Sequence, residues 1–193
     1  MTLHLIRHGR TAANDQKLYC GKADLPLSES GGADIAALAA SGLYPRAGAY
    51  FTSGLLRARQ TLALIYGYAA AEALPGLSEF DFGGFELLSY EQLKEEPAYI
   101  AWITDETGDV CCPGGESRNI FAARVCATFD ALCGRLEQSH VSSSVLVCHG
   151  GTIVQIMDRL RPNEKHFYEW QPAPGRGYSL VFQKGKLCRY KPI

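Results

Sequence analysis

The order of apolar and amphipathic segments predicts an α/β fold, with a mostly parallel central sheet between two layers of helices. Short apolar segments typical of buried strands recur along the chain, and segments of helical periodicity separate most of them. The sequence has no internal repeat, low-complexity tract or long linker. We therefore expect a three-layer α/β/α arrangement and a single domain over residues 1–193.

The first half of the chain begins with strand, loop and helix. Residues 2–6 form a short apolar run that predicts a strand, and the alanine-rich pattern of residues 30–41 predicts a helix that ends near Gly42. A second strand is expected over residues 49–53. It leads into residues 55–66, where apolar side chains lie among arginines as in a partly buried helix.

The middle of the chain gives weaker signals. We expect a third strand over residues 69–74 and a helical segment over residues 89–103 that breaks at Pro97. A turn at Pro113-Gly114-Gly115 precedes a long helix from residue 117 to about residue 138.

The last quarter of the chain returns to strand and helix. Residues 144–148 form an apolar strand, and residues 152–160 form a short helix. Residues 178–182 and 186–190 flank Lys184-Gly185, a pattern that predicts a closing hairpin.

Composition narrows the class of protein. The chain has 193 residues, 47% of them hydrophobic, and a net charge of -1, which does not favour nucleic acid or an acidic membrane surface as a partner. Its seven cysteines form an odd set without a C-x-x-C pair, as expected of reduced thiols. The first apolar run is too short for a signal peptide, and no segment approaches a membrane span. We expect a cytoplasmic protein.

Two of the predicted strands end in a histidine followed by a glycine. Arg7-His8-Gly9 follows the first strand, and His149-Gly150-Gly151 follows the strand over residues 144–148. The carboxyl ends of parallel strands line the ligand crevice, so we expect both motifs at one site. Either histidine alone would more often be a packed strand-end side chain than a catalyst.

A third signal comes from the helix after the second strand. Its first turn can aim Arg57 or Arg59 at the same crevice, where a guanidinium would bind the oxygens of a phosphate through two hydrogen bonds. The alternative is that both arginines lie on a solvated helix face.

A loop in which acidic and aromatic residues alternate supplies candidate proton donors. Aromatic walls desolvate a carboxyl group and raise its pKa, as a proton donor near neutral pH requires. The candidates are Glu79, Asp81 and Glu86, and the sequence pattern alone does not choose among them. The alternative is an ordinary aromatic loop with its carboxylates in water.

Short motifs occur in a fixed order over most of the chain: Arg7-His8-Gly9 with Thr11 and Asn14, Gly21 with Asp24-Leu25-Pro26-Leu27-Ser28, Ser53-x-Leu55-x-Arg57-Ala58 with Gln60-Thr61, Glu79 with Phe82-Gly83, Gly114-Gly115-Glu116-Ser117, and His149-Gly150-Gly151. One tripeptide would be weak evidence, whereas the ordered set is highly specific. The chain resembles the histidine phosphatase superfamily, in its phosphoglycerate-mutase-like branch. The resemblance implies a phosphoglycerate-mutase-like fold and one catalytic domain.

The resemblance also implies roles for individual residues. His8 would be the nucleophile that takes the phosphoryl group, and Glu79 the proton donor and later the base. The groups that would hold the phosphate are Arg7, Arg57 and His149, assisted by Asn14 and the Gly150 amide. We further expect Cys20 and Gly21 at the substrate pocket, although Cys20 also suits a small buried side chain.

Elementary chemistry agrees with these roles. Only a neutral imidazole can attack phosphorus, and flanking arginines disfavour a charged His8. Cationic groups around the phosphoryl oxygens stabilise transfer by positioning and electrostatics, so we expect no metal and no cofactor. The remaining histidines, His4, His140 and His166, match no motif and are assigned to the surface or to packing.

Arg10 and Leu87 depart from the family pattern, which often has an acidic residue or glutamine at the first position and glycine at the second. Because of these departures, the resemblance does not specify which residues form the leaving-group side of the pocket. Residues 85–112, with Tyr99 and Trp102 either as lid residues or in the core, are where we expect that side to form.

The resemblance favours a phosphatase acting on a small phosphorylated metabolite, because mutases of the family are longer after Glu116-Ser117. Short bacterial members that act on α-ribazole phosphate are the nearest expectation for a substrate. The alternatives are a phosphoglycerate mutase and a non-catalytic phosphate-binding relative. Alanine-rich helix faces suit either internal packing or a homodimer.

Overall fold

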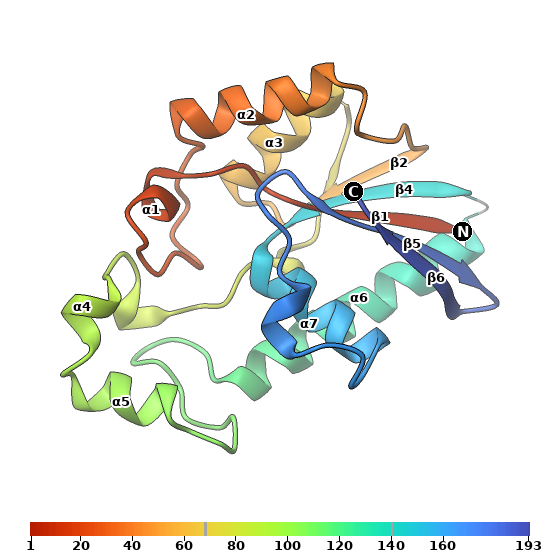
Figure 1. The fold of residues 1–193 in the computed structure, drawn as a ribbon. Coiled ribbons are helices and arrows are strands. Elements are labelled where there is room, and N and C mark those ends of the chain that lie inside the picture. Colours follow the sequence, from red (N-terminus) through yellow and green to blue (C-terminus); the bar gives the residue numbers. More distant parts are fainter. Residues whose placement is uncertain (68, 140) are drawn as a thin grey trace.

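The computed structural model describes residues 1–67, 69–139 and 141–193, and its centre is a six-stranded sheet (Figure 1). The strands, in the spatial order β3-β2-β4-β1-β5-β6, are β3 (Glu72–Ala73), β2 (Ala49–Thr52), β4 (Ser143–Cys148), β1 (Thr2–Arg7), β5 (Gly177–Gln183) and β6 (Lys186–Pro192). Strands β1 to β4 are parallel, whereas β5 runs antiparallel to β1 and β6 antiparallel to β5. The sheet is therefore mostly parallel, as predicted.

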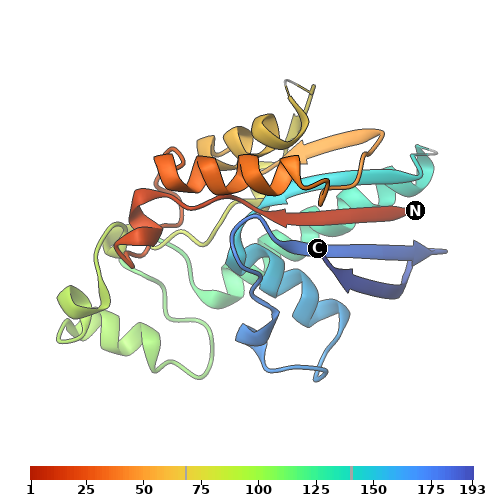
Figure 2. The same cartoon turned by 45° about the horizontal axis from the view of Figure 1, so that its top comes forward.

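Helices cover both faces of the sheet. Helices α2 (Glu29–Ala40) and α3 (Leu56–Tyr66) lie on one face, and α6 (Arg118–Gln138) and α7 (Gly150–Leu160) lie on the other (Figures 1 and 2). This is the three-layer arrangement that the sequence predicts. Each of these helices begins or ends within two residues of its predicted bounds, because the periodic apolar side chains that define it are the ones that pack.

Alternating side chains along the strands build two cores. Ile6 and Val147 pack on one face with Ala58 and Leu62 of α3. Leu5 lies on the opposite face of β1, in the larger core that α6 and α7 cover. Because successive strand residues point to opposite faces, every buried parallel strand needs apolar side chains on both.

Three short helices follow their local signals. They are α1 (Ala12–Asp15), α4 (Tyr90–Leu93) and α5 (Pro97–Ile103). Ser89 caps α4 in a capping box, and Pro97 occupies the first turn of α5, so the predicted break at Pro97 is confirmed. Three turns of 3-10 helix complete the elements, at Pro75–Leu77 (η1), Gly83–Phe85 (η2) and Phe167–Trp170 (η3).

In the middle of the chain, the structure decides the length of the third predicted strand and the place of two aromatic side chains. The strand expected over residues 69–74 is only the two-residue edge strand β3. Tyr99 and Trp102 are 2% and 8% exposed, and their rings pack among Tyr19 and Phe85. Of the two alternatives for these aromatic side chains, the core is therefore confirmed.

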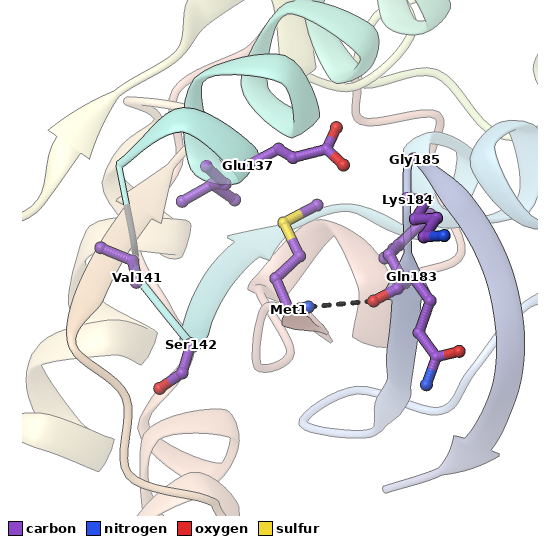
Figure 3. A pocket seen from close by; sticks show the side chains of 9 residues that line it. Met1, Glu137, Val141, Ser142, Gln183, Lys184 and Gly185 are labelled. Atoms are coloured by element: carbon purple, nitrogen blue, oxygen red, sulfur yellow. Dashed lines mark hydrogen bonds between the residues drawn. The ribbon is translucent and has the colours of Figure 1, made fainter.

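A cleft lies at the amino end of the sheet (Figure 3). Met1, Glu137, Val141 and residues 183–185 line it, and the Met1 ammonium group donates to the Phe182 carbonyl. This cleft is at the opposite end of β1 from His8. Among the described residues, no helix combines the length and the apolarity that crossing a bilayer requires.

Candidate active site

The two His-Gly motifs meet at the carboxyl ends of β1 and β4. Arg7 pairs in register with Cys148, and the backbone N–H of His8 donates to the Cys148 carbonyl at 2.9 Å. The imidazole rings of His8 and His149 consequently lie with their centroids 5.1 Å apart, and both side chains are buried. The prediction that the parallel strands bring them together is confirmed.

The hydrogen bonds of His8 fix its tautomer. Its Nδ1 lies 2.6 Å from the Gly9 carbonyl, which can only accept, so Nδ1 carries the proton. Nε2 therefore holds the lone pair, and Arg57 Nε donates to it at 3.3 Å. Burial and the Arg57 charge lower the pKa of His8 to about 3. His8 is thus a neutral imidazole whose free nitrogen faces a cation.

Arg57 is held by more than the histidine. It lies in the first turn of α3, is fully buried, and donates through Nη1 to the Ala23 carbonyl at 2.8 Å and through Nη2 to the Gly21 carbonyl at 2.6 Å. Arg59, the other candidate in this turn, is exposed. The structure therefore brings Arg57 to the site and leaves Arg59 on the surface.

His149 and Arg7 present buried nitrogens at the same place. His149 Nε2 lies 2.7 Å from the Ser53 hydroxyl, and Arg7 Nη1 donates to the Pro172 carbonyl at 2.8 Å. Within the described ranges, His149 Nδ1 and Arg7 Nε are buried without a partner. Burial and the neighbouring His8 lower the pKa of His149 well below its usual value. Buried polar groups are normally satisfied, so this pair fits a site that binds an anion.

The structure separates the three candidate carboxylates. Glu79 accepts from the backbone N–H of Gly151 at 2.9 Å, beside the second His-Gly motif. Asp81 pairs with the exposed Lys22, and Glu86 accepts from backbone N–H groups of residues 21–23. Only Glu79 reaches the start of α7, so the carboxylate that the motif pattern favours is the one beside the histidines.

The loop that carries Glu79 is anchored to α6. Arg124 donates to the Glu79 carbonyl at 3.3 Å and forms an ion pair with Glu116 at 2.7 Å. Glu116 also accepts from the Asp81 backbone N–H at 3.1 Å. Sequence reasoning missed Arg124, which belongs to none of the quoted motifs, whereas Glu116 was quoted without a role.

Two further residues that sequence reasoning left without a role support the histidines. Ser53 is the hydrogen-bond partner of His149, and Thr61 accepts from the Gly9 backbone N–H at 2.9 Å. Both belong to the Ser53 to Thr61 motif, so the signal was present in the sequence. Its meaning depends on contacts between α3 and the end of β1.

The four expected substrate-binding residues differ in their surroundings. Asn14 Oδ1 accepts from Thr11 in the capping box of α1. Cys20 is half-buried, and burial raises the pKa of its thiol. Gly21 reaches the site through its carbonyl on Arg57, while Gly150 packs against Arg7: a Cβ there would lie 3.2 Å from the guanidinium.

The histidines outside the motifs are expected on the surface or in the packed interior. His4 is buried and bonds the Ser179 hydroxyl at 2.8 Å, and His166 is exposed, which agrees with packing and surface roles. His140 lies outside the described residues. Arg10 pairs at the surface with Asp15 and Asp34. The described part of the chain contains no cluster of three or more histidine, cysteine or acidic side chains arranged to hold a metal ion.

Comparison with known proteins identifies the family of the chain. The model of the histidine phosphatase superfamily (branch 1) matches residues 3–187. An adenosylcobalamin/alpha-ribazole phosphatase of Salmonella typhimurium is 33% identical over 165 residues, which cover 83% of this chain and 79% of that protein. A 2,3-bisphosphoglycerate-dependent phosphoglycerate mutase of Beijerinckia indica is 30% identical over 177 residues, covering 83% and 82%.

Solved structures of the same two kinds are similar. The alpha-ribazole phosphatase of Shigella flexneri superimposes with a TM-score of 0.85 at 26% identity, covering 97% of this chain and 93% of that one. The phosphoglycerate mutase of Thermus thermophilus gives 0.70 at 29% identity, covering 98% of each chain. These relatives are phosphatases or mutases, and the expected phosphoglycerate-mutase-like fold is confirmed. The chain belongs to the histidine phosphatase superfamily.

Proposed function

We propose that the protein is a metal-independent phosphomonoesterase that hydrolyses a small phosphorylated metabolite through a phosphohistidine intermediate on His8. The observation that carries the proposal is the state of His8. Its Nδ1 is bound to the Gly9 carbonyl, which leaves the Nε2 lone pair beside the guanidinium of Arg57. A neutral nucleophile next to fixed positive charge suits attack on a phosphate ester.

In the first step, His8 Nε2 attacks phosphorus, an N–P bond forms, and the bond from phosphorus to the ester oxygen breaks. The carboxyl group of Glu79 gives a proton to the departing alkoxide. Arg7, Arg57 and His149 stabilise the charge on the transferring phosphoryl oxygens. The positive charge of the arginines supplies the stabilisation for which other phosphoryl-transfer enzymes use a metal ion.

In the second step, the Glu79 carboxylate takes a proton from water as the water oxygen attacks phosphorus. The N–P bond breaks, its electron pair returns to His8, and inorganic phosphate leaves. The hydrogen bond from Gly151 to Glu79 Oε2 holds the carboxylate at the start of α7 through both steps. One carboxyl group thus serves as acid and then as base.

A phosphatase is favoured over a mutase by the degree of structural similarity. The TM-score is 0.85 for the Shigella phosphatase against 0.70 for the Thermus mutase, whereas sequence identity reaches similar levels for the two kinds, 33% for a phosphatase and 34% for a mutase. Length does not separate the two kinds, since the chain covers 79% of that phosphatase and 82% of that mutase. α-Ribazole phosphate is the first substrate to test.

The test is hydrolysis of an activated aryl phosphate in the presence of a chelator. We expect the wild-type protein to release phosphate and His8→Ala to release none, while His166→Ala, which changes an exposed histidine, keeps full activity. Chelator-sensitive turnover, or an active His8→Ala variant, would contradict the proposal. A panel of α-ribazole phosphate and 3-phosphoglycerate, with and without 2,3-bisphosphoglycerate, distinguishes hydrolysis from transfer between hydroxyls.

A further inference from the structure

We propose that Glu86 is a positioning residue that acts on His8 through Arg57, an inference that rests on the function proposed above. The carboxylate of Glu86 is surrounded by backbone donors. Oε1 accepts from the N–H of Lys22 at 2.8 Å and from that of Phe82 at 3.1 Å. Oε2 accepts from the N–H of Gly21 at 3.0 Å and from that of Ala23 at 3.3 Å. A carboxylate held by several backbone N–H groups is itself fixed, and in turn fixes the peptides that donate.

The peptide between Gly21 and Lys22 connects Glu86 to the arginine. Its N–H donates to Glu86 Oε1 at 2.8 Å, and its carbonyl accepts from Arg57 Nη2 at 2.6 Å. The N–H and C=O of a trans peptide are rigidly coplanar and point in opposite directions, so fixing one fixes the other. Arg57 Nε then reaches His8 Nε2 at 3.3 Å. A continuous chain of hydrogen bonds therefore runs from Glu86 to the proposed nucleophile, and such chains reinforce one another.

The same carboxylate also fixes the segment that carries the proton donor. Phe82, three residues after Glu79, donates its N–H to Glu86 Oε1. The two segments are in direct contact, because a Cβ on Gly21 would lie 1.5 Å from the Phe80 carbonyl oxygen. Glu86 thus holds Arg57 and the Glu79 segment in one arrangement. Lys22 and Asp81 join the same segments only by an ion pair in which the lysine is 74% exposed.

The test is a double-mutant cycle between Glu86 and Arg57. We expect Glu86→Ala to lower kcat about 100-fold with a smaller change in KM, as for a small misplacement of reacting groups. Glu86→Gln, which keeps one acceptor oxygen, should recover part of that loss. In an Arg57→Ala background, Glu86→Ala should lower kcat by about tenfold at most, because only its effect on the Glu79 segment then remains. The matched control Glu91→Ala removes only an exposed ion pair with Lys94 and should keep wild-type kcat.

Binding of inorganic phosphate, measured by calorimetry, repeats the cycle without turnover. Failure of the wild-type protein to form a phosphohistidine would refute the proposed function, yet the coupling of Glu86 and Arg57 in phosphate binding would still be observed. Equal losses from Glu86→Ala in both backgrounds would overturn the positioning role, as would wild-type kcat in that variant. If Glu86→Ala does not fold by circular dichroism, Glu86→Gln carries the same cycle.

Discussion

At the scale of single residues, burial and neighbouring cations set the charge of the two histidines at the site. His8 and His149 are buried beside Arg7 and Arg57, and both histidines have lowered pKa values. Desolvation and nearby cations disfavour an imidazolium, so the folded protein keeps both rings neutral near neutral pH. A neutral ring suits a nucleophile. Keeping the ring neutral lowers the free energy of unfolding when the solution is acidified.

We predict that the free energy of unfolding falls as the pH decreases from about 6.5, the usual histidine pKa, toward 3. The unfolded chain takes up protons at both histidines over this range, whereas His8, with its pKa lowered to about 3, does not until the lower limit. His8 contributes a loss of about 2 kcal/mol between pH 7 and pH 5, and the lowered pKa of His149 adds to it in the same direction. Urea unfolding at both pH values measures the loss. His8→Asn should show a smaller loss and the exposed His166→Gln the full one; equal losses in all three would refute the assignment.

Arg57 tests the geometry of the cation. Its planar group donates to one ring nitrogen and two carbonyls, which a lysine ammonium at the end of a flexible stem does not reproduce. Arg57→Lys should therefore lower kcat/KM by roughly 100-fold, a typical effect of losing a fixed donor. Arg59→Lys, two residues along the same helix and exposed, is the control that should keep wild-type kcat/KM. Wild-type kcat/KM in both variants would show that a positive charge at position 57 is sufficient and that its geometry does not matter.

At the scale of elements, the start of α7 joins the two halves of the proposed chemistry. His149 is the N-cap residue of this helix, and the N–H groups of a first turn have no partner within the helix. The N–H of Gly151 is used by Glu79. The strand-to-helix junction therefore orients a histidine and a carboxylate together, and the glycines after His149 leave room for the Arg7 and Glu79 side chains.

Gly151→Ala should reduce activity without reducing stability. A Cβ at this position would lie 2.4 Å from Glu79 Oε1, so the carboxylate must move, and kcat should fall roughly tenfold or more. Gly134→Ala in α6 is the matched control, because nothing lies within 4 Å of its Cβ. That variant should gain about 0.5–1 kcal/mol of stability at unchanged kcat. Thermal melts and steady-state kinetics check both, and unchanged kcat in Gly151→Ala would refute the role of this contact.

At the scale of the whole molecule, the segment between β3 and α6 packs through an aromatic cluster that also includes Tyr19. The Trp102 ring lies 5.9 Å from Phe80, 6.0 Å from Phe82 and 6.1 Å from Tyr19, measured between centroids. Phe80 directly follows Glu79. The cluster consequently fixes the loop that carries the proposed proton donor, and it brings the side chains of Phe85, Tyr99 and Trp102 into the core.

Trp102→Ala should destabilise the protein by about 3–5 kcal/mol, as expected when a large core side chain is removed. Tyr168→Ala, which removes an aromatic side chain that is 67% exposed, should cost less than about 1 kcal/mol. Urea unfolding measures both. A Trp102→Ala variant with wild-type stability and an altered KM would instead support the lid role.

Local sequence determined the strands β1 and β4, the long helices and the two His-Gly motifs, because apolar periodicity and short motifs are properties of neighbouring residues. The family resemblance then singled out Arg57 and Glu79 from their alternatives. Tertiary structure decided which acidic residue meets the histidines, which arginine is buried, and that β3 is only two residues long. It also decided that Ser53 is the partner of His149 and that Glu86 bonds to residues 21–23. These contacts are hydrogen bonds and burial between segments far apart in the chain, and such segments meet only when the protein folds.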